Sequence, residues 1–165
     1  MKTKFILMAL ISTALLSCGK GKDDAKNASE MGSALSKKRY DSVQSLSGGK
    51  AFIADRVFFN FDEADLSKEY QADLKIQATY LKAKLLENPN SKIVIEGNCD
   101  ERGGVDYNMS LGLKRANSAK KFLVSQGIDA KSIKVTSFGK ERKLVDGVDA
   151  VAYLQNRAAV TKISN

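Results

Sequence analysis

Apolar residues along the chain recur at two spacings, and these spacings predict strands and helices in turn. Residues 57–61 are aromatic or β-branched at four of their five positions, which favours a strand. A long amphipathic helix is predicted over 66–87, and Asn88-Pro89-Asn90 ends it. Its apolar residues stand at helical spacing: Leu66, Tyr70, Leu74, Leu81 and Leu85.

The second half of the chain repeats this alternation of elements. The predicted elements are a strand at 92–96, a helix at 105–126, a strand at 133–138, a short helix or turn at 149–156 and a last strand at 157–163. Strands that alternate with helices favour an α/β fold, here an α+β sandwich in which two main helices cover one sheet.

A Gly-rich turn from Gly97 to Gly104 joins the strand at 92–96 to the helix that follows it. Polar groups on such a turn lie at the rim of a fold and not in its core. Asp100 lies in this turn, and Arg115 lies fifteen positions later, on the helix. Residues three and four positions apart share one helix face. That face comprises Asn108, Leu111, Gly112, Arg115, Ala119 and Phe122.

Arg115 therefore stands on a helix face that is largely apolar, where an unpaired charge costs free energy. Two interpretations remain open. In the first, Asp100 and Arg115 form a structural salt bridge that closes the turn onto the helix. In the second, they form a small site with one anion and one cation. Such a site suits a zwitterion, because an ammonium pairs with the carboxylate and a carboxylate pairs with the guanidinium.

Several motifs resemble, in their order, those of the OmpA-like peptidoglycan-binding domain. They are F-N-F-D at 59–62, I-E-G-x-C-D-E-R-G at 95–103, Y-N-x-x-L-G at 107–112, R-A-N at 115–117, L-V-S-Q-G-I-D-A at 123–130, S-F-G at 137–139 and Q-N-R at 155–157. Within this family the chain is most similar to the lipoproteins of Tol–Pal systems. The resemblance implies a mixed sheet with the order β-α-β-α-β-β and a site for the diamino acid of the peptidoglycan peptide stem.

The resemblance also assigns roles to single residues. In the family, the Asp of C-D-E-R-G and the Arg of R-A-N hold the diamino acid, and here these are Asp100 and Arg115. Leu111 is then an apolar wall of the site, while Asn108 orders the turn or the ligand.

The resemblance places two further residues, Phe61 and Asp62, beside the ligand. Phe61 is equally explained as part of the core, and Asp62 as a helix or turn cap. Two departures from the family pattern bear on selectivity: Asn98 stands where the family usually has His, and Ala158 replaces the second Arg of N-R-R.

The first residues predict export and a lipid anchor. Basic residues precede an apolar stretch at 5–16, which is too short to span a bilayer, so residues 1–17 are a predicted signal peptide. Leu15-Leu16-Ser17-Cys18 resembles a lipobox, which implies that Cys18 is lipidated. The alternative is an ordinary secretory signal. Gly19 follows the cysteine and favours sorting to the outer membrane, with the domain facing the periplasm.

The predicted organisation has three parts. After the signal peptide, residues 18–50 comprise the lipidated cysteine and a flexible tether that is rich in Lys, Ser, Asp, Asn and Gly. Residues 51–165 form the OmpA-like domain.

Composition narrows the possible chemistry. The chain has no histidine, so catalysis or metal binding by imidazole is excluded, and no cofactor or metal is expected.

The chain's net charge is +8, and without the signal peptide 25 basic residues stand against 19 acidic ones, or +6. A mildly basic domain suits anionic wall polymer or lipid headgroups. Nucleic acid is not favoured, because no block of Lys and Arg alternates with aromatics. Cys99 is then a lone thiol that acts as a small apolar residue.

The function implied by the resemblance is binding and not catalysis. The chain would tether the outer membrane to peptidoglycan, with TolB-like and other Tol proteins as possible partners. A wall-anchoring lipoprotein without Tol partners is an alternative. A glycan hydrolase that uses Glu96 and Asp100 is another, although a neighbouring Arg would keep Asp100 ionised and unsuited to act as an acid.

Overall fold

The computed structural model describes residues 44–48 and 53–164. The predicted signal peptide, the lipobox with Cys18 and most of the predicted tether lie outside the described residues. Within those described ranges, no helix has the length and apolar character needed to cross a membrane.

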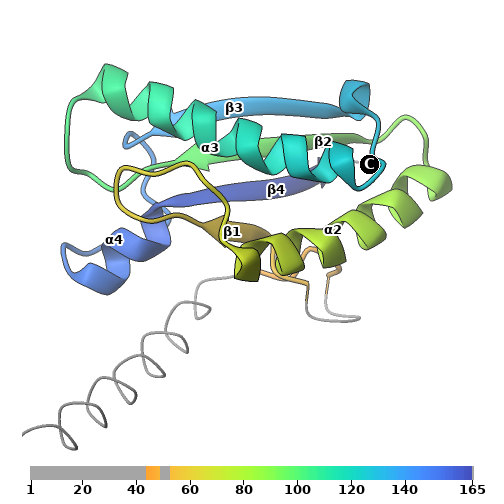
Figure 1. Ribbon diagram of the computed structural model, residues 1–165, viewed down its shortest axis with the longest axis horizontal. Helices are drawn as coiled ribbons and strands as arrows, with labels where there is room; N and C mark the ends of the chain where they lie inside the picture. The colour runs from red at the N-terminus through yellow and green to blue at the C-terminus, as the bar shows by residue number, and fades with distance from the viewer. Residues whose placement is uncertain (1–43, 49–52, 165) are drawn as a thin grey trace, which may run out of the picture. The chain divides into compact units, whose positions relative to one another are not determined.

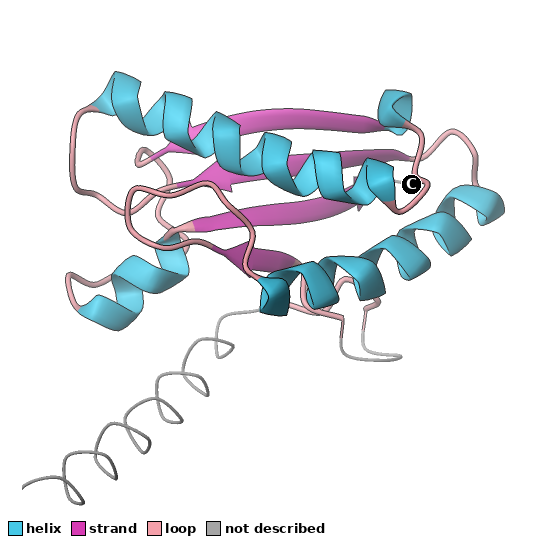
Figure 2. Cartoon of the chain, in the orientation of Figure 1, coloured by secondary structure: helices cyan, strands magenta, loops and turns pink. Residues whose placement is uncertain are grey.

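The described part folds as a sheet with helices packed on it, as the alternating pattern predicts (Figure 2). The strands are β1 (Arg56–Phe58), β2 (Lys92–Asn98), β3 (Ile133–Gly139) and β4 (Ala158–Ser164), and the helices are α2 (Lys68–Glu87), α3 (Val105–Ser125) and α4 (Ala150–Asn156). A 3-10 turn at Ala130–Ser132 precedes β3. The first strand ends at Phe58 and not at residue 61 as predicted, because the chain then turns toward α3.

The sheet is mixed, which confirms the expectation drawn from the resemblance. Its strand order is β1-β4-β2-β3, with β2 and β3 parallel and β4 antiparallel to both of its neighbours. The last strand of the sequence therefore lies inside the sheet, between β1 and β2. Helices α2 and α3 lie side by side and cover one face of the sheet (Figure 1).

The core lies between this sheet face and the two long helices. Leu74 and Leu81 from α2, Ile93 and Ile95 from β2 and Leu123 from α3 are fully buried in it. At Gly97 the backbone of β2 approaches α3 so closely that a Cβ would overlap the carbonyl group of Gly112. This glycine pair lets the next turn of α3, with Arg115, lie against the end of β2.

Residues 44–48 belong to the folded part, which differs from the tether predicted to extend to residue 50. Ser45 forms a β-bridge with Ala54, and the Leu46 amide donates to the carbonyl of Ile53 at 2.8 Å. The side chain of Leu46 packs against the core. Polar composition predicted a tether here, but a single apolar side chain with paired backbone is sufficient to hold the segment on the domain.

Candidate binding pocket

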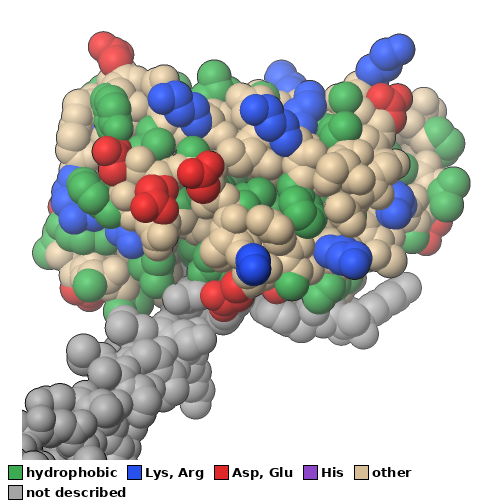
Figure 3. Space-filling view, viewed as in Figure 1, with side chains coloured by type: hydrophobic (Ala, Val, Ile, Leu, Met, Phe, Trp, Pro, Cys, Tyr) green, Lys and Arg blue, Asp and Glu red, His purple; other side chains and the backbone are tan. Residues whose placement is uncertain are grey.

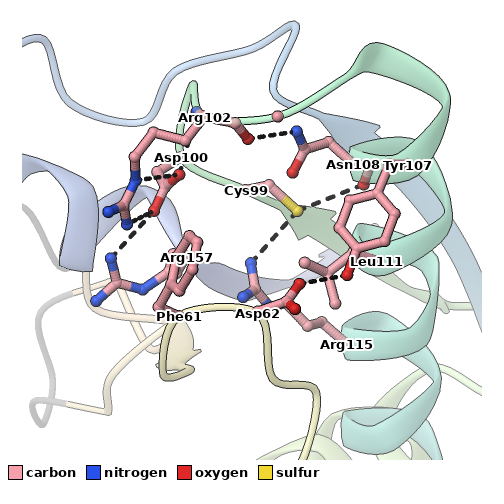
Figure 4. A pocket seen from close by; sticks show the side chains of 11 residues that line it. Phe61, Asp62, Cys99, Asp100, Arg102, Tyr107, Asn108, Leu111, Arg115 and Arg157 are labelled. Carbon is pink, nitrogen blue, oxygen red and sulfur yellow. Dashed lines mark hydrogen bonds and ion pairs between the residues drawn. The ribbon is translucent and has the colours of Figure 1, made fainter.

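A pocket of about 240 Å³ opens where four segments of the chain meet (Figure 4). These segments are the loop between β1 and α2, the turn after β2, the first turns of α3 and the residue before β4. All six residues that the sequence assigned to the site line it: Phe61, Asp62, Asp100, Asn108, Leu111 and Arg115. Five further residues complete the lining: Cys99, Arg102, Gly103, Tyr107 and Arg157.

The turn after β2 is held in place by Asn108. The Asn108 side-chain amide donates to the carbonyl oxygens of Arg102 and Gly104, at 2.8 and 3.0 Å. Gly103 adopts a φ of 90°, a left-handed conformation that a residue with a Cβ rarely takes. Because both features fix the backbone of the turn, the carboxylate of Asp100 is presented to the pocket in one position.

Arg115 is fully buried and is bound by backbone carbonyl groups. Its Nε donates to the carbonyl of Glu63 at 2.8 Å, and its Nη2 donates to that of Asn60 at 3.1 Å. Its Nη1 donates to the carbonyl of Asn98 at 3.0 Å and to the sulfur of Cys99 at 3.3 Å. Four of its five N–H groups are thereby used, and one remains.

Of the two interpretations left open by the sequence, the structural salt bridge between Asp100 and Arg115 is therefore wrong. The guanidinium joins the β1–α2 loop to the end of β2. Burial lowers the pKa of Arg115 from its very high ordinary value, but an arginine keeps its charge in proteins. The pocket thus has a fixed positive charge at its base.

Asp100 pairs instead with two other arginines. The Asp100 side chain is only 4% exposed, and its Oδ2 lies 2.6 Å from Nη2 of Arg102 and 3.1 Å from Nη1 of Arg157. Its Oδ1 accepts from the amide and from Nε of Arg102, both at 3.2 Å. Burial alone would raise the pKa of Asp100, but the hydrogen bonds from Arg102 and Arg157 outweigh it and leave the pKa below its ordinary value.

The residues that follow β1 are placed by the chain's turn away from the sheet. Phe61 is 58% exposed, so its explanation as a core residue is wrong, and its ring faces the guanidinium of Arg102 at 4.2 Å. Asp62 does not cap α2, since Ser67 does so by accepting from the amide of Tyr70. Asp62 has a φ of 61° and accepts a hydrogen bond from the hydroxyl of Tyr107.

Cys99 is buried as a free thiol, but it is more than a small apolar residue. Its sulfur contacts the Arg115 guanidinium and donates to the carbonyl of Asn108 at 3.4 Å. Burial raises its pKa, so the thiol stays neutral and is not a nucleophile at neutral pH.

Sequence reasoning missed Arg102, Tyr107 and Arg157 as site residues. Each stands inside a motif that carries the resemblance, and this was the available signal. Residue spacing could not predict the ion pair between Asp100 and Arg157, because 57 positions separate the two residues. Only the placement of β4 in the sheet brings them together.

Glu96 lies apart from this pocket, in a charged hollow of its own. Its carboxylate is 2.5 Å from Nη2 of Arg142 and 3.0 Å from Nζ of Lys162. Burial would raise its pKa, but these two cations outweigh the effect and lower it. Glu96 and Asp100 are both paired as carboxylates and do not line a common pocket, so these two residues do not form the carboxylate pair that glycan cleavage would need.

Comparisons with known proteins agree with this fold. The sequence profile of the OmpA family matches residues 58–157. A mixed sheet under two helices is the arrangement of an OmpA-like domain, and the chain belongs to the OmpA family.

Three relatives show how far the likeness extends. The peptidoglycan-associated lipoprotein of Haemophilus influenzae is 42% identical over 104 residues, which cover 63% of this chain and 65% of that protein. The peptidoglycan-associated lipoprotein of Pasteurella multocida is 36% identical over 158 residues, 96% of this chain and 95% of that protein. The crystal structure of the peptidoglycan-associated lipoprotein from Burkholderia pseudomallei superposes with a TM-score of 0.61 at 36% identity, over 67% of this chain and 90% of that one.

Proposed function

We propose that this chain is an outer-membrane lipoprotein that binds peptidoglycan non-covalently through the diamino acid of the peptide stem. The observation that carries the proposal is the pocket, in which one ionised carboxylate lies beside guanidinium groups. The names of the relatives support the same class of ligand, and the similarity extends over nearly the whole chain in one of them.

The pocket's charges suggest how a stem would be oriented. Asp100 would accept the ammonium of the diamino acid, and Arg115 would attract its carboxylate. Because four N–H groups of Arg115 are already bound, it would contribute its charge and one hydrogen bond instead of a bidentate fork. Leu111 and the ring of Phe61 would contact the aliphatic part of the side chain between the two charged groups.

The proposal includes membership of a Tol–Pal system, with TolB-like proteins as partners. Its support is the similarity to peptidoglycan-associated lipoproteins in sequence and fold. On the outer surface formed by α2 and α3, basic side chains are spread among hydrophobic and neutral ones and do not form one continuous block (Figure 3). Such a distribution does not favour a polyanion over a protein as the partner of that face.

Binding to purified cell-wall sacculi tests the central proposal. The full chain, purified in mild detergent, should sediment with sacculi from a bacterium whose stems carry diaminopimelate. Free diaminopimelate should release it in a concentration-dependent manner. A chain that stays in the supernatant at every protein concentration would refute wall binding.

We predict that affinity for the stem is constant between about pH 5 and pH 8. The pKa of Asp100 is lowered, burial raises the pKa of the Cys99 thiol and arginines keep their charge, so Asp100, Cys99 and the guanidinium groups do not change charge in that range, and the chain has no histidine. A carboxyl with a lowered folded-state pKa contributes stability that is present above its unfolded pKa. That contribution is lost as the pH falls through the folded value. Calorimetric titration at several pH values checks this, and a midpoint near pH 6 or 7 would contradict it.

We further propose that Cys18 is the lipid anchor, and predict that Cys18→Ser releases the protein from the membrane or blocks its processing. A single acyl chain holds a protein only weakly, so stable anchoring needs the several chains that a bacterial lipoprotein carries. Fractionation of cells, with immunodetection in the membrane and soluble periplasmic fractions, measures this. A Cys18→Ser protein that still fractionates with the outer membrane would contradict the anchor.

A further inference from the structure

Within the pocket, arginine side chains of the chain itself already occupy the carboxylate that would receive the ligand's ammonium. Both oxygens of Asp100 accept hydrogen bonds from guanidinium groups, and its side chain is 4% exposed. An incoming ammonium therefore cannot contact this carboxylate closely unless one of the two guanidinium groups moves away.

The two arginines on Asp100 are not equally fixed. Arg157, which immediately precedes β4, has a side chain that is 13% exposed. Its Nε also donates to the carbonyl of Phe59 at 3.0 Å. Arg102 has a side chain that is 42% exposed and reaches Asp100 from the pocket's rim. Its guanidinium lies 4.2 Å from the ring of Phe61 and 4.6 Å from the ring of Tyr153. Moving the guanidinium of Arg102 away from Asp100 therefore costs less free energy than moving that of Arg157.

We propose that Arg102 is an internal competitor of the ligand: its guanidinium occupies the ammonium position on Asp100, and stem binding exchanges one cation for the other. This inference rests on the proposed function. A protein that binds only in a fraction of its conformations shows an affinity reduced by that fraction. The docked guanidinium lowers the affinity for every cation in this way, so a ligand must bring further contacts, such as a carboxylate near Arg115, to displace it.

Two aromatic rings stabilise the docked position of Arg102. Cations stack favourably on aromatic faces, and here one ring comes from the β1–α2 loop and the other from α4. The hydroxyl of Tyr153 donates to Glu101 at 3.2 Å, which holds this ring beside the turn that carries Asp100. Tyr153 does not line the pocket, so it affects the ligand indirectly, through Arg102 and through the turn residue Glu101.

The position of Asp100 does not depend on the guanidinium of Arg102. The backbone amide of Arg102 donates to Oδ1 at 3.2 Å, and its carbonyl accepts from Asn108. Both contacts persist when the side chain is shortened, and Arg157 still holds Oδ2. Substitution of Arg102 therefore opens the carboxylate without removing it from the pocket.

The test is a titration of the full chain with the stem tripeptide L-Ala–γ-D-Glu–meso-diaminopimelate. We expect Arg102→Ala and Arg102→Gln to bind it about five- to thirtyfold more tightly than the wild type. Tyr153→Ala should tighten binding by a smaller factor, because it removes one of the stacking rings. Arg142→Ala is the matched control, since it deletes the same charge from the Glu96 hollow, and its affinity should stay within about twofold.

The outcomes distinguish competition by Arg102 from a direct contact of Arg102 with the ligand and from an effect of net charge. Equal or weaker binding by the Arg102 variants would overturn the proposal, and weaker binding would make Arg102 a direct ligand contact. If Arg142→Ala also bound the peptide more tightly, the gain in affinity would be explained by the loss of one positive charge, and this result would also overturn the proposal. If the wild type and all variants fail to bind the peptide, the proposed function itself fails, and this result is distinguishable from the others.

Discussion

Asp100→Ala should lose wall binding, with affinity for the stem reduced about 30-fold to several-thousand-fold, or about 2–5 kcal/mol. The carboxylate is the anion that the pocket offers to an ammonium, and it is held ionised by two arginines. Its removal leaves three guanidinium groups against the single carboxylate of Asp62, and this excess of positive charge repels the ligand's cation. Sedimentation with sacculi and titration with the stem peptide measure the loss.

Binding loss alone does not distinguish a ligand contact from a structural one, so stability must be measured on the same variants. Asp100→Asn keeps the side chain's shape and an oxygen that can accept from the amide of Arg102. It should retain the melting temperature closely and still lose most of the affinity. Lys114→Ala, on the exposed side of α3, is the control and should change neither quantity. If Asp100→Asn and Asp100→Ala both bound like the wild type, the assignment of Asp100 to the binding site would be wrong.

Arg115→Ala should destabilise the domain by about 3–5 kcal/mol, a large part of the total stability of about 5–15 kcal/mol expected for a domain. Arg115 is fully buried, and its guanidinium is the partner of the carbonyl groups of Asn60, Glu63 and Asn98. Truncation to alanine would leave the buried carbonyl of Asn98 unpaired and would remove the partner of the part-buried carbonyls of Asn60 and Glu63, and an unpaired buried polar group costs about 1–3 kcal/mol. Chemical denaturation of the variant and the wild type measures the difference.

The helix itself provides the comparison for this prediction. Lys114 is adjacent in sequence but exposed, so Lys114→Ala should shift stability by no more than about 0.5 kcal/mol. Arg115→Lys retains the charge but not the planar array of donors, and it should recover only part of the loss. A near-native denaturation midpoint for Arg115→Ala would show that the residue serves the ligand alone.

Hydrophobic spacing was enough to predict the elements, but not how the strands pair. The helices at 66–87 and 105–126 correspond to α2 and α3 because their buried residues recur at three and four positions. The short strand β1 ends at Phe58, since the turn that follows is fixed by Arg115, which contacts Asn60 and Glu63 from another element. The mixed pairing came from the family resemblance, because residue spacing within a strand does not specify its neighbours.

The sequence predicted which residues line the candidate pocket, but not which of them form ion pairs with one another. All six residues proposed from the sequence line the pocket. Asp100, Asn108, Leu111 and Arg115 do so because a turn and the first turns of the next helix are necessarily near each other, whereas Phe61 and Asp62, from the β1–α2 loop, were placed only by the family resemblance. The ion pairs were not predictable, because three arginines compete for Asp100 and the distances among them depend on the whole fold. The closest one, Arg102, is two residues away, while Arg157 comes from the far end of the sequence.

The position of β4 determines when the domain can be completed. Because β4 lies between β1 and β2, a chain without its last residues has β1 separated from β2 and β3. Arg157, which immediately precedes β4, supplies one of the two side chains that hold Asp100. Contacts between residues so distant in sequence form late, because closing a long loop costs entropy before the contact is gained. During synthesis the sheet therefore cannot be completed before β4 is available, and sheet and pocket are completed together.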